Sequence, residues 1–313
     1  MKNYILIFCF LLMGSAAVAQ QKALYSQYMT NYYLLNPAVA GMEKDITFKA
    51  GYRNQWVGFK GAPKTFYVSG ETALFKENLT EGQAYHGVGG YAYTDQAGPT
   101  TRTGLLLSYA YHVPLSESIY LSSGVFAGMQ QYRFDASKVY LAEGSNERDP
   151  VTSGGNFNSF MPDLSVGTYI HSDKFFAGVS LFQVLGNKIH AVDDVEDPSR
   201  LYRHLFVSGG YNLDVHSNIV VTPSVLLKYV NAAPLQADLN VKGAYHFTDG
   251  AKSKYDNMVW AGVSYRTNDA VVGLLGMQFK EQYQLSYSYD ITTSPINDYS
   301  SGSHEIVLGF RLQ

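Results

Sequence analysis

The chain has 313 residues, of which only 16% are charged and 14% are aromatic, with 26 Tyr and 17 Phe. Ordinary soluble domains carry about 25% charged residues, so this composition argues against a soluble enzyme. A formal net charge of −3 is too small to indicate a nucleic-acid partner.

Residues 1–19 have the three-part layout of a secretory signal peptide. Lys2 supplies the positive start, Tyr4 to Met13 form the apolar stretch, and Ala17-Val18-Ala19 is a small-x-small cleavage sequence. We therefore predict export with cleavage after Ala19. The single cysteine, Cys9, lies within this peptide, so the mature protein is expected to have no disulfide and no thiolate metal site.

Residues 20–313 are predicted to form one domain, because no linker or composition break divides them. They contain no uninterrupted apolar run of the roughly 18 residues that a spanning helix needs. A β-barrel can cross a membrane without such a run, because only alternate residues of its strands face lipid. We expect a short non-strand N-terminal segment over residues 20–45 and an all-β, antiparallel transmembrane barrel over residues 46–313.

Single-residue alternation of apolar and polar side chains predicts about 14 strands, an even number, as bacterial single-chain barrels have. In chain order the predicted strands are Ile46–Gln55, Lys64–Leu74, His86–Thr94, Arg102–Val113, Ile119–Tyr132, Asp163–His171, Phe175–Val184, Arg203–Leu213, Ile219–Tyr229, Leu235–Thr248, Asn257–Arg266, Ala270–Lys280, Gln284–Ile291 and Glu305–Leu312.

The alternation also predicts which side chains face lipid and which face the interior. The residues expected to face lipid are Leu239, Val241, Leu285, Tyr287, Tyr289, Ile306 and Leu308. Those expected to face the interior are Asp238, Asn240, Gln284, Ser286 and Glu305. Periplasmic turns of such barrels are short. The two longest connections, Arg133 to Pro162 and Leu185 to Tyr202, are therefore expected outside, with both termini in the periplasm.

Several sequence blocks resemble one family. They are LYSQYMTNYYLLNPAVAG at Leu24 to Gly41, YRNQWVGFKGAPKT at Tyr52 to Thr65, Met161-Pro162-Asp163, LSYSYD at Leu285 to Asp290, and GSHEI at Gly302 to Ile306. Together they resemble the PorP/SprF family of type IX secretion system membrane proteins of the Bacteroidetes. The candidate family-motif or partner-contact residues are Tyr28, Tyr32, Asn36, Pro37, Gly41, Arg53, Asn54, Gln55, Trp56, Pro63, Lys64, Thr65, His304 and Glu305.

This resemblance implies a barrel of the cell outer membrane that works with the type IX secretion and gliding-motility machinery. The implied partners are secreted cargo with a C-terminal targeting domain, which is retained at the cell surface, and a periplasmic peptidoglycan-binding lipoprotein. A passive porin is the first alternative and a barrel-type membrane hydrolase is the second. Raised conductance would favour the porin, whereas co-purification with secretion components would favour the accessory barrel.

No catalytic constellation, cofactor motif or metal site is predicted. His304 and Glu305 are adjacent in a strand, so their side chains point to opposite faces and cannot share a lumenal substrate. Gly87-Val88-Gly89-Gly90 resembles half a dinucleotide fingerprint, but no helix pattern follows it. We interpret these glycines as positions of close packing within a strand.

Three further features leave alternatives open. The acidic run Asp193 to Asp197 fits a solvated outer loop, with a Ca²⁺ site as the alternative. Trp56 fits an interfacial aromatic belt, with partner contact as the alternative. The segment Leu24 to Gly41 is too rich in Tyr and Leu to remain in water. It is therefore expected either to plug the lumen or to dock a periplasmic partner.

Overall fold

The computed structural model describes residues 22–43, 45–75, 82–139, 156–189, 200–231, 233–247, 257–280 and 282–312. The expected signal peptide over 1–19 and the acidic run Asp193 to Asp197 lie outside these residues. The strands are β1 (Ile46–Asn54), β2 (Lys64–Ala73), β3 (Tyr85–Ala97), β4 (Thr100–Pro114), β5 (Tyr120–Phe134), β6 (Phe157–His171), β7 (Phe175–Phe182), β8 (His204–Tyr211), β9 (Leu213–His216), β10 (Ile219–Val230), β11 (Ala233–His246), β12 (Met258–Arg266), β13 (Ala270–Phe279), β14 (Tyr283–Thr292) and β15 (Ser303–Leu312).

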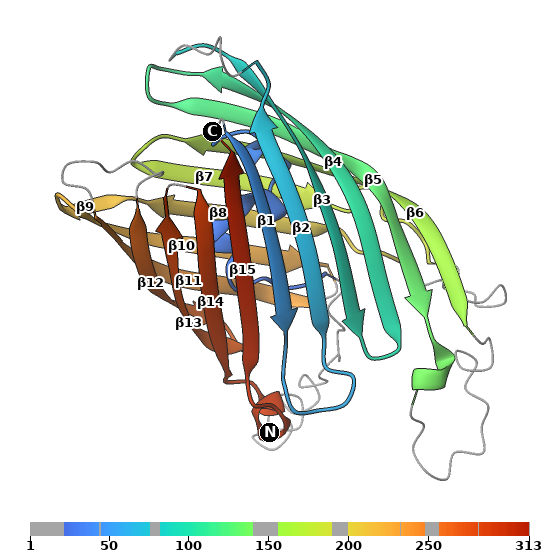
Figure 1. The fold of residues 1–313 in the computed structure, drawn as a ribbon. Helices are drawn as coiled ribbons and strands as arrows, with labels where there is room; N and C mark the ends of the chain where they lie inside the picture. The colour runs from blue at the N-terminus through green and yellow to red at the C-terminus, as the bar shows by residue number, and fades with distance from the viewer. Residues whose placement is uncertain are drawn as a thin grey trace, which may run out of the picture.

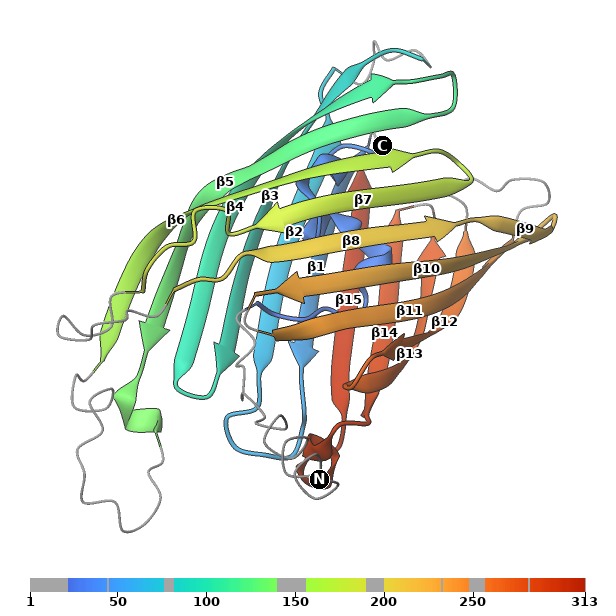
Figure 2. The ribbon, with the colours of Figure 1, turned by 180° about the vertical axis from the view of Figure 1, so that it is seen from behind.

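The strands form one closed antiparallel ring, drawn from two sides in Figures 1 and 2. β1 pairs with β15 from Ile46↔Leu312 to Asn54↔His304, which joins the first strand to the last. β8 and β9 both pair with β10, in one register apart from a shift between Ile219 and Val220, so they count as one wall strand interrupted at Asn212. The described strands therefore make a barrel of 14 wall strands, with β8 and β9 counted as one, and the predicted number of strands is confirmed.

The alternation along the strands separates an outer face from an inner one. The seven residues predicted to face lipid are all exposed, from 36% for Tyr289 to 57% for Leu308. Of the residues predicted to face the interior, Asp238, Ser286 and Glu305 are at most 1% exposed, and Gln284 is half-buried. The predicted faces and register are confirmed, and the outer wall presents apolar and aromatic side chains.

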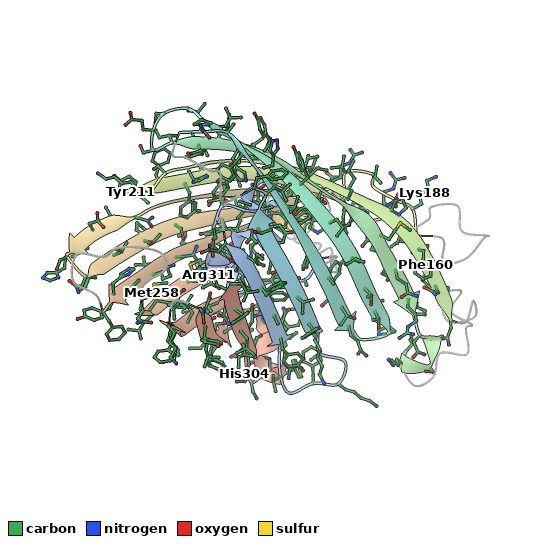
Figure 3. All side chains as sticks on the ribbon, turned by 45° about the horizontal axis from the view of Figure 1, so that its top comes forward. Phe160, Lys188, Tyr211, Met258, His304 and Arg311 are labelled. Atoms are coloured by element: carbon green, nitrogen blue, oxygen red, sulfur yellow. The ribbon has the colours of Figure 1, made fainter. Side chains whose placement is uncertain are left out.

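The two ends of the barrel differ. One end, called the loop-rich end, carries the connections 55–63, 135–156, 183–203 and 293–302, so the two longest connections share an end as predicted. The other, called the short-turn end, carries the turns 115–119 and 172–174, the longer connections 74–84 and 247–257, the start of β1 and the end of β15. Figure 3 shows His304 and Arg311 at these opposite ends of β15.

Most strand boundaries differ from the prediction by one to three residues, and the start of β6 differs by more. β6 begins at Phe157, six residues before the expected Asp163, because Phe157 to Pro162 continue the antiparallel register with β5 up to Phe134↔Phe157. Pro162 cannot donate a backbone hydrogen bond, which weakens the strand signal in the sequence. No helix in the described ranges is both long and apolar enough to cross a membrane.

Candidate functional site: a plug in the barrel lumen

Residues 22–43, called the plug, lie inside the ring of strands. They appear as the blue segment enclosed by the wall in both Figure 1 and Figure 2. Tyr33, Leu34, Ala38 and Ala40 are fully buried against the inner faces of the strands. Of the two alternatives that the sequence left open for this segment, the structure shows the lumenal one.

The plug folds as three short 3₁₀ turns, η1 (Tyr28–Thr30), η2 (Tyr32–Leu34) and η3 (Pro37–Val39). Asn31, with φ −152°, separates the first two turns and prevents a longer helix. Asn36 caps η3, because its side-chain Oδ1 accepts a hydrogen bond from the Ala38 N–H at 2.9 Å. Pro37 then occupies the first position of the turn, where its missing N–H costs nothing.

The plug crosses the lumen from one end to the other. Ser26 contacts Arg53 at the end of β1 and Glu305 near the start of β15, both at the loop-rich end. Gly41 approaches Gly87 and Thr72, which lie at the short-turn end. The expectation that both ends of the chain lie on one side is therefore not met by the described residues, because Lys22 lies at the loop-rich end and Leu312 at the short-turn end.

At the loop-rich end the plug meets buried charges. The Ser26 N–H donates to Glu305 Oε2 at 2.7 Å, and its hydroxyl donates to Asp290 Oδ2 at 2.7 Å. The same hydroxyl oxygen accepts from Arg53 Nη1 at 2.8 Å and from Arg266 Nη2 at 3.0 Å. One serine therefore contacts two guanidinium groups and two carboxylates.

These charges are also paired with each other across the wall. Arg53 Nη2 lies 2.7 Å from Asp290 Oδ2, and its Nη1 lies 3.3 Å from Glu305 Oε2. Arg266 forms ion pairs with Asp238, Asp269 and Asp290. Lys228 extends the network through a 2.9 Å contact with Asp238. Six strands, β1, β10, β11, β12, β14 and β15, thus contribute to one buried network, which is stable in a low dielectric only because its charges are paired.

At the short-turn end the plug is held by close backbone packing. Asn36 Nδ2 donates to Thr168 O at 2.9 Å and to Val179 O at 3.3 Å. A Cβ at Gly124 would lie 2.6 Å from the backbone of Pro37 and Ala38, so only glycine leaves room for the turn.

Ala40 and Gly41 continue this close packing. A Cβ at Gly87 would lie 1.8 Å from the Ala40 carbonyl oxygen, which is 2.8 Å from His112 Nε2. Gly41 has φ +78° and donates its N–H to Glu71 at 3.0 Å. The glycines Gly87 and Gly89 thus serve the packing of Ala40 and Tyr33, which confirms the interpretation of that run.

Tyrosine hydroxyls anchor the middle of the plug. Tyr25 OH lies 2.5 Å from Tyr91 OH, Tyr33 OH lies 2.7 Å from Ser108 Oγ, and Asn240 Nδ2 donates to Tyr28 OH at 2.7 Å. Burial raises the pKa of Tyr28, Tyr32 and Tyr33, so these hydroxyls stay protonated at neutral pH. Between Lys22 and Glu43 the plug thus presents neutral groups to the wall.

The sequence matches the family described as type IX secretion system membrane protein PorP/SprF over residues 17–310. The chain belongs to the PorP/SprF family. This is a family of secretion-system membrane proteins, not a known enzyme family. No curated protein matches the chain in sequence.

Solved outer-membrane channels share the fold of this PorP/SprF barrel. The toluene transporter TbuX of Ralstonia pickettii has a TM-score of 0.51 at 9% identity, covering 92% of this chain and 94% of its own. A FadL homologue of Pseudomonas aeruginosa has a TM-score of 0.50 at 11% identity, covering 88% and 91%. The monoaromatic hydrocarbon channel CymD has a TM-score of 0.50 at 12% identity, covering 94% of both chains. At such identities the likeness shows the fold alone.

The family blocks of this PorP/SprF chain fall into two places. The first block forms the plug: Tyr28 is buried, Tyr32 is half-buried and packs on Phe176 at a ring distance of 5.0 Å, and Asn36, Pro37 and Gly41 hold its short-turn end. Arg53, from the second block, and Glu305, from the last, are charged residues that form hydrogen bonds with Ser26.

The other predicted residues lie around the loop-rich rim. Asn54 ends β1 opposite His304 and Lys64, and the buried Gln55 donates its backbone N–H to Pro63 O at 2.9 Å. Thr65 is buried, and its hydroxyl donates to Asp95 at 2.7 Å. These residues stabilise the loop-rich rim.

The conspicuous aromatic and histidine residues also lie at this rim. Trp56, with φ +50°, lies in the loop after β1 and stacks on Phe59 at 6.3 Å, so it is not on the lipid-facing side of a strand. His304 faces outward, where its Nδ1 lies 2.6 Å from Tyr287 OH, while Glu305 faces inward. The two side chains point to opposite faces, as predicted.

Several residues of the site were not singled out in the sequence. Ser26, Asp290 and Arg266 hold the loop-rich half of the plug, and His112 holds the short-turn half. Asp290 and Arg266 occupy inward positions of the alternation, which was the available signal. Over the described ranges there is no group of three or more His, Cys, Asp and Glu side chains that could hold a metal ion.

Proposed function

We propose that this protein is an accessory barrel of the cell outer membrane, exported through a cleaved signal peptide over residues 1–19, and that it acts by binding proteins. Residues 20–313 form a single domain, and the loop-rich end faces the cell exterior. In this proposal the loop-rich end holds secreted cargo that carries a C-terminal targeting domain. The short-turn end binds a periplasmic component of the type IX secretion or gliding machinery, such as a peptidoglycan-binding lipoprotein.

The single observation that carries this proposal is the filled lumen of a barrel that belongs to a secretion-system family. The plug lies in the lumen, where a diffusion porin requires an open passage, and its contacts run from Ser26 at one end to Gly41 at the other. The outer wall is apolar and suited to lipid. The two rims are therefore the surfaces on which the protein can recognise partners.

Each rim offers an exposed apolar side chain suited to such contacts. At the loop-rich end, Tyr299 in η6 (Pro295–Tyr299) is 74% exposed, and its carbonyl approaches Gly58 in the loop that carries Trp56. At the short-turn end, Leu115 is 57% exposed in the turn between β4 and β5. Exposed aromatic and aliphatic side chains on a polar rim are common anchors of protein interfaces.

A passive channel is the second candidate function. It is favoured by the fold shared with proteins named as a toluene transporter and a hydrocarbon channel. It is opposed by the plug and by the network of paired charges around Ser26. Planar-bilayer conductance separates the two candidates, because a passive channel conducts steadily in its native form.

The test of the proposed function uses one variant at each rim, so that each serves as the control for the other. Tyr299→Ser should reduce capture and surface retention of cargo and leave capture of the periplasmic component unchanged. Leu115→Ser should have the reverse effect. Both variants should reach the outer membrane in normal amounts, since neither side chain is buried. If the wild-type protein captures neither kind of partner in affinity purification, the proposed function is wrong.

A further inference from the structure

We infer that the plug is a removable ligand of a preformed wall, and that the lumen conducts water and small ions when the plug leaves. The protein would then have two states, one closed by its own N-terminal segment and one open. This inference concerns the lumen and does not depend on which proteins bind at the rims.

The first support is the chemistry of the plug itself. Residues 23–42 contain no Asp, Glu, Lys, Arg or His. Every contact between this stretch and a charged wall group uses a hydroxyl, an amide or a backbone group, such as the Thr30 carbonyl, which accepts from Lys49 Nζ at 2.7 Å. Water can replace neutral donors and acceptors of this kind, whereas it cannot replace a buried counter-charge at low cost.

The second support is the pairing within the wall. Arg53 keeps Asp290 and Glu305 as partners, and Arg266 keeps Asp238, Asp269 and Asp290, without any contribution from the plug. Removal of Ser26 therefore leaves no isolated charge in the lumen. The charged network is complete before the plug arrives.

The third support is the placement of the two charges at the borders of the plug. Glu43, beside β1, pairs with Arg311 Nη2 at 2.7 Å and with Lys49 at 3.9 Å, so it remains with the wall as an attachment point. Lys22, at the other border, lies with its ammonium 3.1 Å from the ring centre of Phe182. The Lys22 charge also interacts with the Asp163 carboxylate on β6. When Lys22 leaves, its ammonium regains water, and Asp163 keeps the hydrogen bonds that Gln130 and Ser165 donate to it.

The closed state dominates because the plug buries apolar and aromatic side chains. Tyr25, Tyr28, Tyr33 and Leu34 are at most 3% exposed, and returning them to water is unfavourable. Opening is therefore a minority event in the isolated protein, and it increases when the plug is shortened or when another group binds it. The lumen left behind is lined on one side by the charged network, which favours hydrated ions.

The experiment combines a deletion with a tether in the full-length protein. Deletion of residues 23–40, with the signal peptide kept, should give a folded, heat-modifiable barrel that conducts steadily in planar bilayers. A synthetic peptide of residues 22–41, added to the deleted barrel, should close most of its channels. The same peptide with Ser26→Ala should need a several-fold higher concentration.

The tether is the double variant Asn31→Cys, Ser69→Cys, because Asn31 Nδ2 and Ser69 Oγ lie 3.2 Å apart between the plug and β2. Its rare openings should vanish on oxidation and return on reduction. The matched control is Thr94→Cys, Thr103→Cys, whose hydroxyls lie 3.2 Å apart between two wall strands, β3 and β4. Oxidation of this control should not change the openings.

Two results would overturn the inference. A deleted chain that cannot fold would make the plug part of the barrel core, and a folded deletion that conducts no more than the full-length protein would leave no passage to plug. The inference would also be overturned if the tethered variant opened equally often in its oxidised and reduced forms. Partner capture is measured separately on the tethered protein, so failure of the proposed function and failure of this inference give different results.

Discussion

The wall and the plug satisfy their polar groups in different ways. The wall carries the charges and pairs them with each other, as Arg266 does with Asp238, Asp269 and Asp290. The plug carries no charge over residues 23–42. Many of its polar groups depend on groups of the wall as hydrogen-bond partners. The wall can keep its structure without the plug, because its charges are paired within it. The plug cannot keep its structure without the wall, because its polar groups would lose their partners. The difference indicates a wall that is stable by itself and a plug whose structure depends on the wall.

The largest effect is expected from breaking the wall. Arg266→Met removes one partner from three carboxylates in the buried network, and loss of a buried partner costs about 3 to 5 kcal/mol. The free energy of unfolding of the barrel in detergent should fall by that amount. The control is Lys138→Met at the exposed 3.6 Å pair with Asp135, which should leave the unfolding transition unchanged. Equal effects of the two changes would contradict the contrast between wall and surface.

A smaller effect is expected where wall and plug meet by shape. Gly87→Ala places a methyl group against the Ala40 carbonyl, and such overpacking costs about 1 to 3 kcal/mol. The short-turn half of the plug should loosen, which thermal unfolding and basal conductance both measure. Gly243→Ala is the matched control, because a methyl group there meets nothing within 4 Å. Its unfolding temperature should equal that of the wild type.

The smallest effect is expected inside the plug. Ser26→Ala removes a hydroxyl that contacts Asp290 and two arginines, yet those charges remain paired in the wall. The net loss should be about 1 kcal/mol, the usual contribution of one intramolecular hydrogen bond. The frequency of channel openings should rise by roughly fivefold. A loss as large as that of Arg266→Met would show that the wall depends on the plug for its charge balance.

Much of the wall could be predicted from the sequence because a period of two is a strong local signal. The inward placement of Asp238 and the outward placement of Tyr287 follow from that period alone. Their partners do not, because the contact between Arg266 and Asp290 depends on the register of three strands. The early start of β6 was missed because Pro162 interrupts the pattern there.

The plug was harder to predict than the wall. Its composition indicated that the tyrosine side chains are buried. Short 3₁₀ turns, however, have no periodicity that indicates toward which face each side chain points. The contact of Ser26 with Glu305 joins residues that are 279 positions apart. Only the closed barrel brings them together, so no local pattern signals it. The close packing of Ala40 on Gly87 can likewise be recognised only once the positions of β3 and the plug are known.

The position of Ser26 has a consequence for biogenesis. The first and last strands meet along the pairing of Ile46 with Leu312 through Asn54 with His304, and a nascent barrel must complete this seam last. Ser26 contacts Arg53 on one side of the seam and Glu305 on the other. It therefore bridges the two strands from within. Insertion into the membrane and seating of the N-terminal segment should consequently be completed in a single late step, and a chain whose seam stays open should also leave this segment accessible to protease.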